Sequence, residues 1–156
     1  SDLFYKGIRP ALNVGISVSR VGGSAQSKAM KKVAGRLRLD LAQFRELEAY
    51  AAFGSDLDEA TQAKIDRGQR IVELFKQNQY SPKSLETEVA VLWSMQNGHF
   101  DDVAVERVKE CQNALEEYLT NRKADLLQLI ANDKALTDAV TEGLNQALSD
   151  FKASWK

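Results

Sequence analysis

The chain has 156 residues, a length that fits about one domain and is sufficient to bury a sizeable hydrophobic core. Lys and Arg number 21 and Asp and Glu number 22, so the net charge of −1 argues against general binding to nucleic acid. Its single cysteine, Cys111, excludes an internal disulfide and a cysteine-rich zinc site, and no apolar run is long enough to predict a membrane-spanning helix. These features favour a cytosolic or equivalent reducing compartment.

Charge is distributed unevenly along the chain. Residues 1–38 carry a net charge of +7, whereas residues 39–156 carry −8. The N-terminal segment therefore differs in kind from the rest, either as an arm or as the remnant of another domain.

Residues 11–19, ALNVGISVS, alternate between apolar residues and small or polar ones, which predicts a β-strand with one apolar face. Because no later segment offers a second convincing strand, its backbone groups would need a partner outside this chain. Arg20 follows the predicted strand directly, at the edge where α/β sheets bind ligands. A solvated loop arginine is the alternative interpretation.

From Ser24 onward, apolar residues three and four apart predict one long amphipathic helix that ends before Gly54. Cations crowd its first half, at the end where the helix dipole disfavours them. They either face an acidic or phosphate-bearing partner or form a solvated basic face. These cations are Lys28, Lys31, Lys32, Arg36 and Arg38.

The segment containing Asp56 and Asp58 predicts the N-terminus of the next helix, which is expected to end at Gly68 before a second short helix. Residues 77–80 predict a polar loop. Ser81 and Pro82 then predict the cap and first turn of a helix that Gly98 ends. Further apolar stripes bring the total to about six or seven helices, a mainly α fold.

Residues for catalysis are scarce. His99, between Gly98 and Phe100, is typical of a helix-ending turn, and Cys111 lies on an apolar stripe that predicts a core position. No phosphate-binding GxxxxGK[ST] loop is present. The residues alone therefore indicate a binding or structural module and not an enzyme.

Several stretches nevertheless resemble the alpha subunits of F-type rotary ATP synthases, namely LFYKGIRPALNVGISVSRVGGSAQ, LAQFREL, FGSDLD and RGQRIVELFKQNQYSP. The similarity covers the whole chain and is densest in residues 3–82. It implies the C-terminal part of such a subunit, without its N-terminal barrel and most of its P-loop domain. Residues 1–23 would then be the last piece of the nucleotide-binding domain, and residues 24–156 the C-terminal helical domain. The expected fold is an orthogonal multi-helix bundle preceded by one orphan β-strand.

The resemblance also assigns roles by position. Arg20 matches the arginine that reaches into the catalytic site of a neighbouring beta subunit, where it would act as an arginine finger. Ser17, Val18 and Ser19 match the segment that positions this arginine, and the family needs Ser17 for activity.

A second set matches the residues that enclose the adenine at the alpha subunit's own, non-catalytic nucleotide site. That site would hold ATP or ADP with Mg in the intact subunit, whereas no nucleotide or metal is expected on this chain alone. Glutamine amides can both donate to and accept from the edge of a base. The matched residues are Phe4, Arg9, Pro10, Gln77 and Gln79.

Asp56 and Asp58 match the segment that faces the rotating central stalk, a role compatible with helix capping. The implied partners are the beta subunits and the gamma subunit, on the cytoplasmic face of a bacterial inner membrane or the equivalent matrix or stromal side. The intact complex is a proton-translocating ATP synthase, but this chain alone is not expected to hydrolyse ATP.

The orphan strand could also pair copies of the chain. A stand-alone helical adaptor that lost the nucleotide domain is the alternative, and an in-frame P-loop upstream would exclude it.

Overall fold

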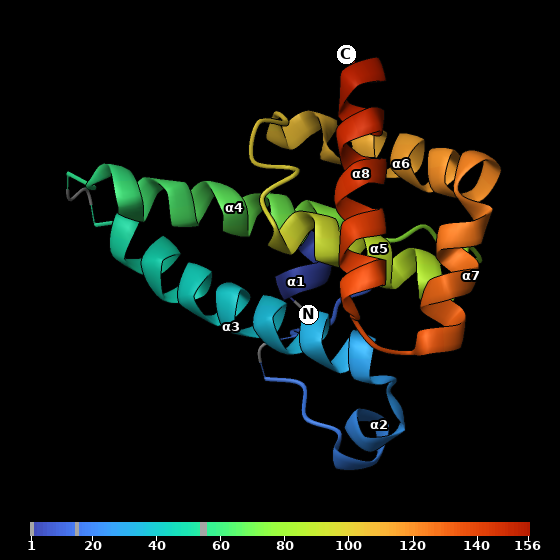
Figure 1. Ribbon diagram of the computed structural model, residues 1–156. Helices are drawn as coiled ribbons and strands as arrows, with labels where there is room; N and C mark the ends of the chain where they lie inside the picture. Colours follow the sequence, from blue (N-terminus) through green and yellow to red (C-terminus); the bar gives the residue numbers. More distant parts are fainter. Residues whose placement is uncertain (1, 15, 54–55) are drawn as a thin grey trace.

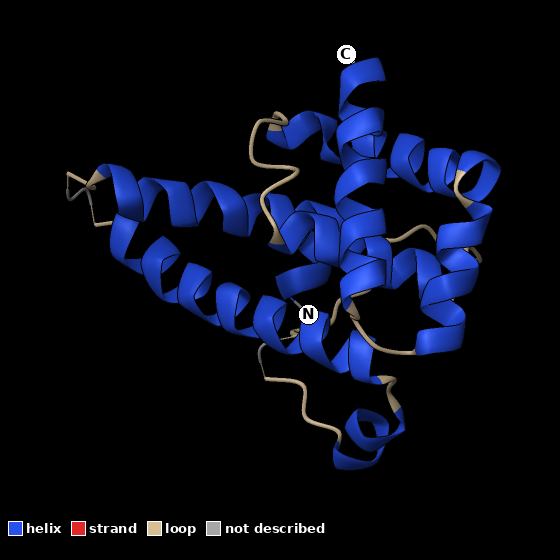
Figure 2. Cartoon of the chain, in the orientation of Figure 1, coloured by secondary structure: helices blue, strands red, loops and turns tan. Residues whose placement is uncertain are grey.

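The computed structural model describes residues 2–14, 16–53 and 56–156, and within these ranges it contains eight α-helices, one short 3₁₀ helix and no β-strand (Figure 2). The elements are α1 (Asp2–Tyr5), α2 (Arg20–Ala25), α3 (Lys28–Ala51), α4 (Glu59–Phe75), α5 (Leu85–Gln96), η1 (Val105–Arg107), α6 (Val108–Arg122), α7 (Ala124–Asp133) and α8 (Asp138–Ser154).

The two longest neighbouring helices, α3 and α4, form an antiparallel hairpin that projects from the rest of the bundle (Figure 1). Helix α5 packs between the base of this hairpin and helices α6, α7 and α8. Eight of its twelve residues are buried, because it is surrounded by other helices on most sides. The expected multi-helix bundle is therefore present, and α5 lies at its centre.

The predicted β-strand at residues 11–19 is wrong. Residues 11–14 and 16–19 form turns and irregular backbone, while Gly15 lies outside the described residues. A strand needs a neighbouring edge to pair with, and the described part of the chain supplies none. The backbone instead bonds locally, since the Ser17 N–H donates to the Asn13 carbonyl at 2.9 Å. Pairing of copies through this strand consequently loses its structural basis.

The N-terminal segment is attached to the helical bundle, although its predicted strand was expected to need a partner outside this chain. The Arg38 guanidinium donates to the Ser17 carbonyl at 2.5 Å, and Val14 packs against the core. Even so, Ile16 and Val18 remain 78% and 86% exposed. The alternating apolar pattern of residues 11–19 therefore includes side chains that this chain leaves exposed.

The helix predicted from Ser24 is in fact two helices, because Ser27 interrupts the pattern and caps α3. Its hydroxyl accepts from the Met30 N–H at 3.2 Å. The opposite error occurs at Gly68, where a break was predicted but α4 continues without interruption. An added Cβ at Gly68 would stand 2.2 Å from Cγ of Phe44, so this glycine permits the close packing of α3 against α4.

Helix caps decide several other boundaries. Asp58 caps α4 by accepting from the Thr61 N–H at 2.7 Å, which confirms a helix start in this segment. The predicted cap at Ser81 is wrong, because Ser84 caps α5. Gly98 follows the end of α5 with φ of +82°, as predicted for a helix-terminating glycine.

Candidate functional site

The N-terminal segment meets the loop that joins α4 to α5, here called the 76–84 loop. The Gln77 N–H donates to the Arg9 carbonyl at 2.9 Å, joining residues that lie far apart in the sequence. The Arg9 guanidinium in turn lies over the Phe4 ring, 4.3 Å from its centroid. Three of the five residues assigned to the adenine pocket are therefore in one place, and Pro10 and Gln79 lie beside them in sequence.

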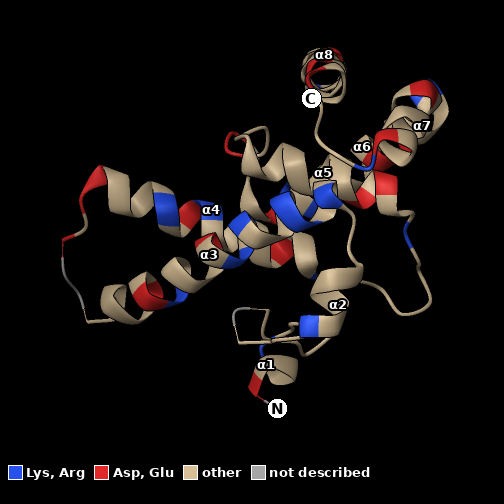
Figure 3. Cartoon of the chain, turned by 60° about the horizontal axis from the view of Figure 1, so that its bottom comes forward, with Lys and Arg blue, Asp and Glu red and all other residues tan. Residues whose placement is uncertain are grey.

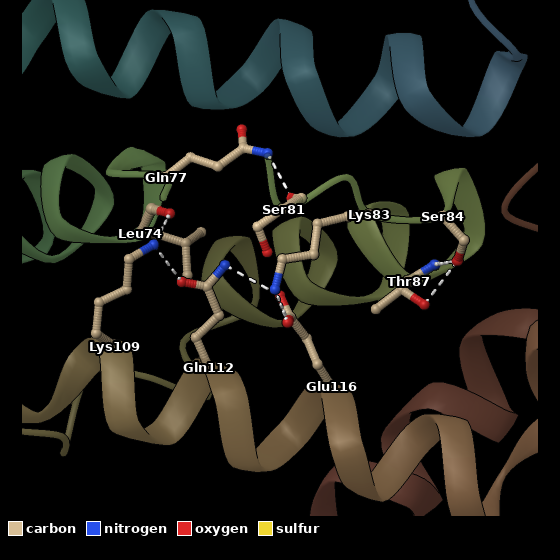
Figure 4. A network of polar contacts seen from close by, with 9 residues as sticks. All are labelled: Leu74, Gln77, Ser81, Lys83, Ser84, Thr87, Lys109, Gln112 and Glu116. Atoms are coloured by element: carbon tan, nitrogen blue, oxygen red, sulfur yellow. Dashed lines mark hydrogen bonds and ion pairs between the residues drawn. The ribbon is translucent and has the colours of Figure 1, made fainter. Parts of the chain in front are cut away.

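The side chains of this cluster are accessible. Phe4 is 45% exposed, and Arg9, Gln77 and Gln79 are also exposed. The Gln77 Nε2 donates to the Ser81 carbonyl at 2.9 Å, so its Oε1 is oriented away from that bond as an acceptor (Figure 4). An exposed ring and a guanidinium can stack on a planar base, and the oriented amide of Gln77 can hydrogen-bond its edge. This chemistry fits an adenine, and the binding role stays a prediction.

Arg20 lies at a separate place, as the first residue of α2, rather than in the loop that was predicted. Its side chain is exposed. Ser19 caps the helix by accepting from the Gly22 N–H at 3.0 Å, and the Ser24 hydroxyl donates to the Arg20 carbonyl at 2.9 Å. The backbone that carries Arg20 is therefore held on both sides. The predicted domain boundary between residues 23 and 24 falls within this helix.

The five cations in the first half of α3 are exposed and gather near α2 (Figure 3). One of them, Arg38, is engaged with the Ser17 carbonyl. The choice between a partner and a solvated face stays open for the others.

The tip of the α3–α4 hairpin carries Asp56 and Asp58, both exposed. Hydrogen bonds from Thr61 lower the pKa of Asp58 below its ordinary value. The structure adds two aromatic side chains near this tip, Tyr50 and Phe53, which are 59% and 87% exposed. No prediction from the sequence included them. Both aromatic residues fall outside the apolar stripe of α3, and this position is the signal that could have identified them.

His99 and Cys111 occupy structural positions. His99 lies in the turn after α5 and stacks on Trp93 with ring centroids 5.6 Å apart. Burial, together with the positive charge of Lys152, lowers the pKa of His99. Cys111 is 1% exposed, and burial raises its pKa to about 11. Within the described residues, no three His, Cys, Asp or Glu side chains gather in a way that could hold a metal ion.

Residues 26–151 match the family described as the ATP synthase alpha/beta chain, C terminal domain. The chain belongs to this family. It is also 54% identical over all 156 residues to proteins named ATP synthase subunit alpha from Acidothermus cellulolyticus and from Streptomyces griseus. These matches confirm the resemblance to the C-terminal part of an alpha subunit.

The chain spans 28% and 30% of the lengths of these two relatives. Their similarity extends through residues 1–25, outside the domain match, where Phe4, Arg9 and Arg20 lie. Among the described helices, none combines the length and apolar character needed to cross a bilayer.

Proposed function

We propose that this chain is the C-terminal region of the alpha subunit of an F-type ATP synthase, and that it completes two nucleotide sites. The observation that carries this proposal is the 54% identity to alpha subunits over every residue of the chain. The intact subunit would assemble with beta subunits and the central-stalk gamma subunit. The assembly would lie peripherally on the cytoplasmic side of a bacterial inner membrane, or on the equivalent matrix or stromal side.

The first site would enclose the adenine of ATP or ADP at the alpha subunit's non-catalytic position. The contact between Arg9 and Gln77 supports it, because it joins the two segments that would form the pocket. The Gln77 Oε1 would accept from the amino group of adenine while Nε2 stays bonded to the Ser81 carbonyl. The bound nucleotide would supply regulation, and its phosphates and Mg would be held by parts of the intact subunit outside this chain.

The second site would be catalytic and would lie mainly in a neighbouring beta subunit. The exposed Arg20 at the start of α2 would reach the transferred phosphoryl group. A planar guanidinium suits the charge that spreads over the phosphoryl oxygens in the transition state. Ser17, Val18 and Ser19 would set the position of this arginine. The tip carrying Asp56 and Asp58 would face the central stalk.

Replacement of Arg20 by Lys or Ala in an assembled head tests the catalytic role. Multi-site turnover is expected to fall by a factor on the order of 10³, as for other arginine fingers, with a much smaller effect on nucleotide affinity. Turnover of either variant within about twofold of the parent would refute the role.

Replacement of both Gln77 and Gln79 by Ala tests the adenine pocket. Occupancy of the non-catalytic site by ATP should fall, whereas bond cleavage at the beta site should continue. Unchanged occupancy, measured by filtration binding with the catalytic sites blocked, would remove the adenine assignment.

A further inference from the structure

Helix α6 contacts the chain on both sides of Gln77 and Gln79, in the last turn of α4 and near the end of the 76–84 loop. Before the loop, the Lys109 Nζ donates to the Leu74 carbonyl at 2.9 Å, in the last turn of α4. Near the end of the loop, Lys83 forms an ion pair with the Glu116 carboxylate. Lys109 and Glu116 both project from α6 toward the loop, as Figure 4 shows. A single helix thus contacts the end of α4, just before the loop, and Lys83 near the end of the loop.

The two attachments are linked through Gln112, which is buried on the same face of α6. Its Oε1 accepts from the Lys109 Nζ at 2.8 Å, and its Nε2 donates to the Glu116 Oε1 at 3.2 Å. The result is one continuous polar chain from the Leu74 carbonyl to Lys83 (Figure 4). Each internal polar atom in it has a partner, the condition under which such a network rigidifies its surroundings.

Glu116 is the residue on which this chain depends, because it connects the loop to Gln112. Its side chain is 13% exposed, and that of Lys83 is 26% exposed, so their attraction is only partly screened by water. Partial desolvation lowers the pKa of Lys109, while the Glu116 carboxylate acts in the opposite direction and favours its charged form. Removing the carboxylate would leave Lys83 without this partner and would remove the negative charge that favours the charged form of Lys109.

We propose that Glu116 is a positioning residue for the nucleotide loop: through Lys83 and Gln112 it fixes residues 76–84 so that Gln77 and Gln79 present their amides to a base. The inference rests on the proposed function for the binding step, but the attachment of the loop can be measured without nucleotide. In this proposal, helix α6 influences the nucleotide site although none of its side chains contacts the nucleotide.

Two measurements on Glu116→Gln test this proposal. The first is amide hydrogen exchange of the nucleotide-free chain. Exchange of the hydrogen-bonded loop amides of Lys76 and Gln77 should quicken by about tenfold or more, with no change in the buried helix α5. The matched control is Glu110→Gln, the same substitution on the same helix, which removes the pair between Arg107 and Glu110 at 2.9 Å without touching the loop. Equal exchange of the loop in both variants would overturn the proposal.

The second measurement is ATP binding at the non-catalytic site of an assembled head. Glu116→Gln should raise the Kd on the order of tenfold, corresponding to the loss of one charge-assisted hydrogen bond that orders the site. Lys83→Met should also raise the Kd. The Kd of the double variant should be no higher than that of Glu116→Gln or Lys83→Met alone, because both substitutions remove the same ion pair between Lys83 and Glu116. Lys83→Arg keeps the charge and should retain most of the affinity. Additive losses, or an effect of Glu110→Gln equal to that of Glu116→Gln, would refute the positioning role.

The double variant Gln77→Ala/Gln79→Ala, measured in the same assay, separates failure of this inference from failure of the adenine site. If the double variant weakens ATP binding and Glu116→Gln does not, the positioning role is wrong and the adenine site stands. If neither changes the affinity, the adenine site is wrong, and with it the proposed role of Glu116 in binding.

Discussion

Gly68 lies where α4 packs most closely on α3, and its replacement by alanine gives a sharp test of how these helices meet. A Cβ at this position would stand 2.2, 2.3 and 2.5 Å from Cγ, Cδ2 and Cβ of Phe44. Ordinary carbon contacts lie at about 3.5–4.0 Å, so the new methyl group overlaps Phe44 by more than about 1 Å. Phe44 is only 5% exposed and cannot swing into solvent without leaving the core.

The size of the effect follows from two opposing contributions. Overpacking of a core costs about 1–3 kcal/mol, and the overlap with the Phe44 Cβ, close to the backbone, points to the upper end. Alanine recovers about 1 kcal/mol over glycine through its higher helix propensity. We therefore expect Gly68→Ala to destabilise the chain by about 2 kcal/mol.

Gly35 provides the matched control, because it lies in α3, is exposed and would meet nothing within 4 Å of an added Cβ. Gly35→Ala should stabilise the chain by up to about 1 kcal/mol, so the two substitutions should have opposite signs. Urea unfolding followed by circular dichroism measures both, provided that the m-value stays constant. A Gly68→Ala variant as stable as Gly35→Ala would refute the close packing of α3 on α4. In a Phe44→Ala background, which lacks the ring carbons, Gly68→Ala should cost less.

Three further outcomes are expected. Because burial raises the pKa of Cys111 to about 11, its thiol in the native chain should react with iodoacetamide at pH 8 at least about a hundredfold more slowly than in urea; equal rates would show that it is not buried. Ser84→Ala should cost about 1 kcal/mol through loss of the α5 cap, whereas Ser81→Ala should be nearly neutral; urea unfolding would reveal the reverse order if Ser81 were the cap. Hydrogen bonds from Thr61 lower the pKa of Asp58, so the parent should have a larger free energy of unfolding than Asp58→Ala. This difference should be complete above the ordinary pKa of 3.8 and should disappear as the pH falls through the lowered pKa. A difference in stability that stays constant across acid unfolding curves would contradict this.

The periodic spacing of apolar residues was sufficient to predict the helical bundle, because each amphipathic helix must bury its stripe against another. Local chemistry also placed a helix start near Asp58 and the end of α5 before Gly98. The same local rules failed at Gly68, where the unfavourable propensity of one glycine is outweighed by the packing that it permits against Phe44. They also failed at Ser81, since Ser84 offers the α5 backbone an equivalent hydroxyl three residues later.

What the sequence by itself determined is therefore the helical bundle, the family and the types of residue available for binding. The alternation of apolar residues in residues 11–19 predicted a strand that the described part of the chain does not contain. A strand forms only where a second segment pairs with its backbone, and the alternation of one segment does not show whether such a partner exists. Tertiary structure alone decided which distant residues meet. The hydrogen bonds from Gln77 to Arg9 and from Lys109 to Leu74, and the ion pair between Lys83 and Glu116, join segments whose spacing carries no periodic signal. Such contacts arise from how the helices pack, and the spacing of residues along the chain does not reveal that packing.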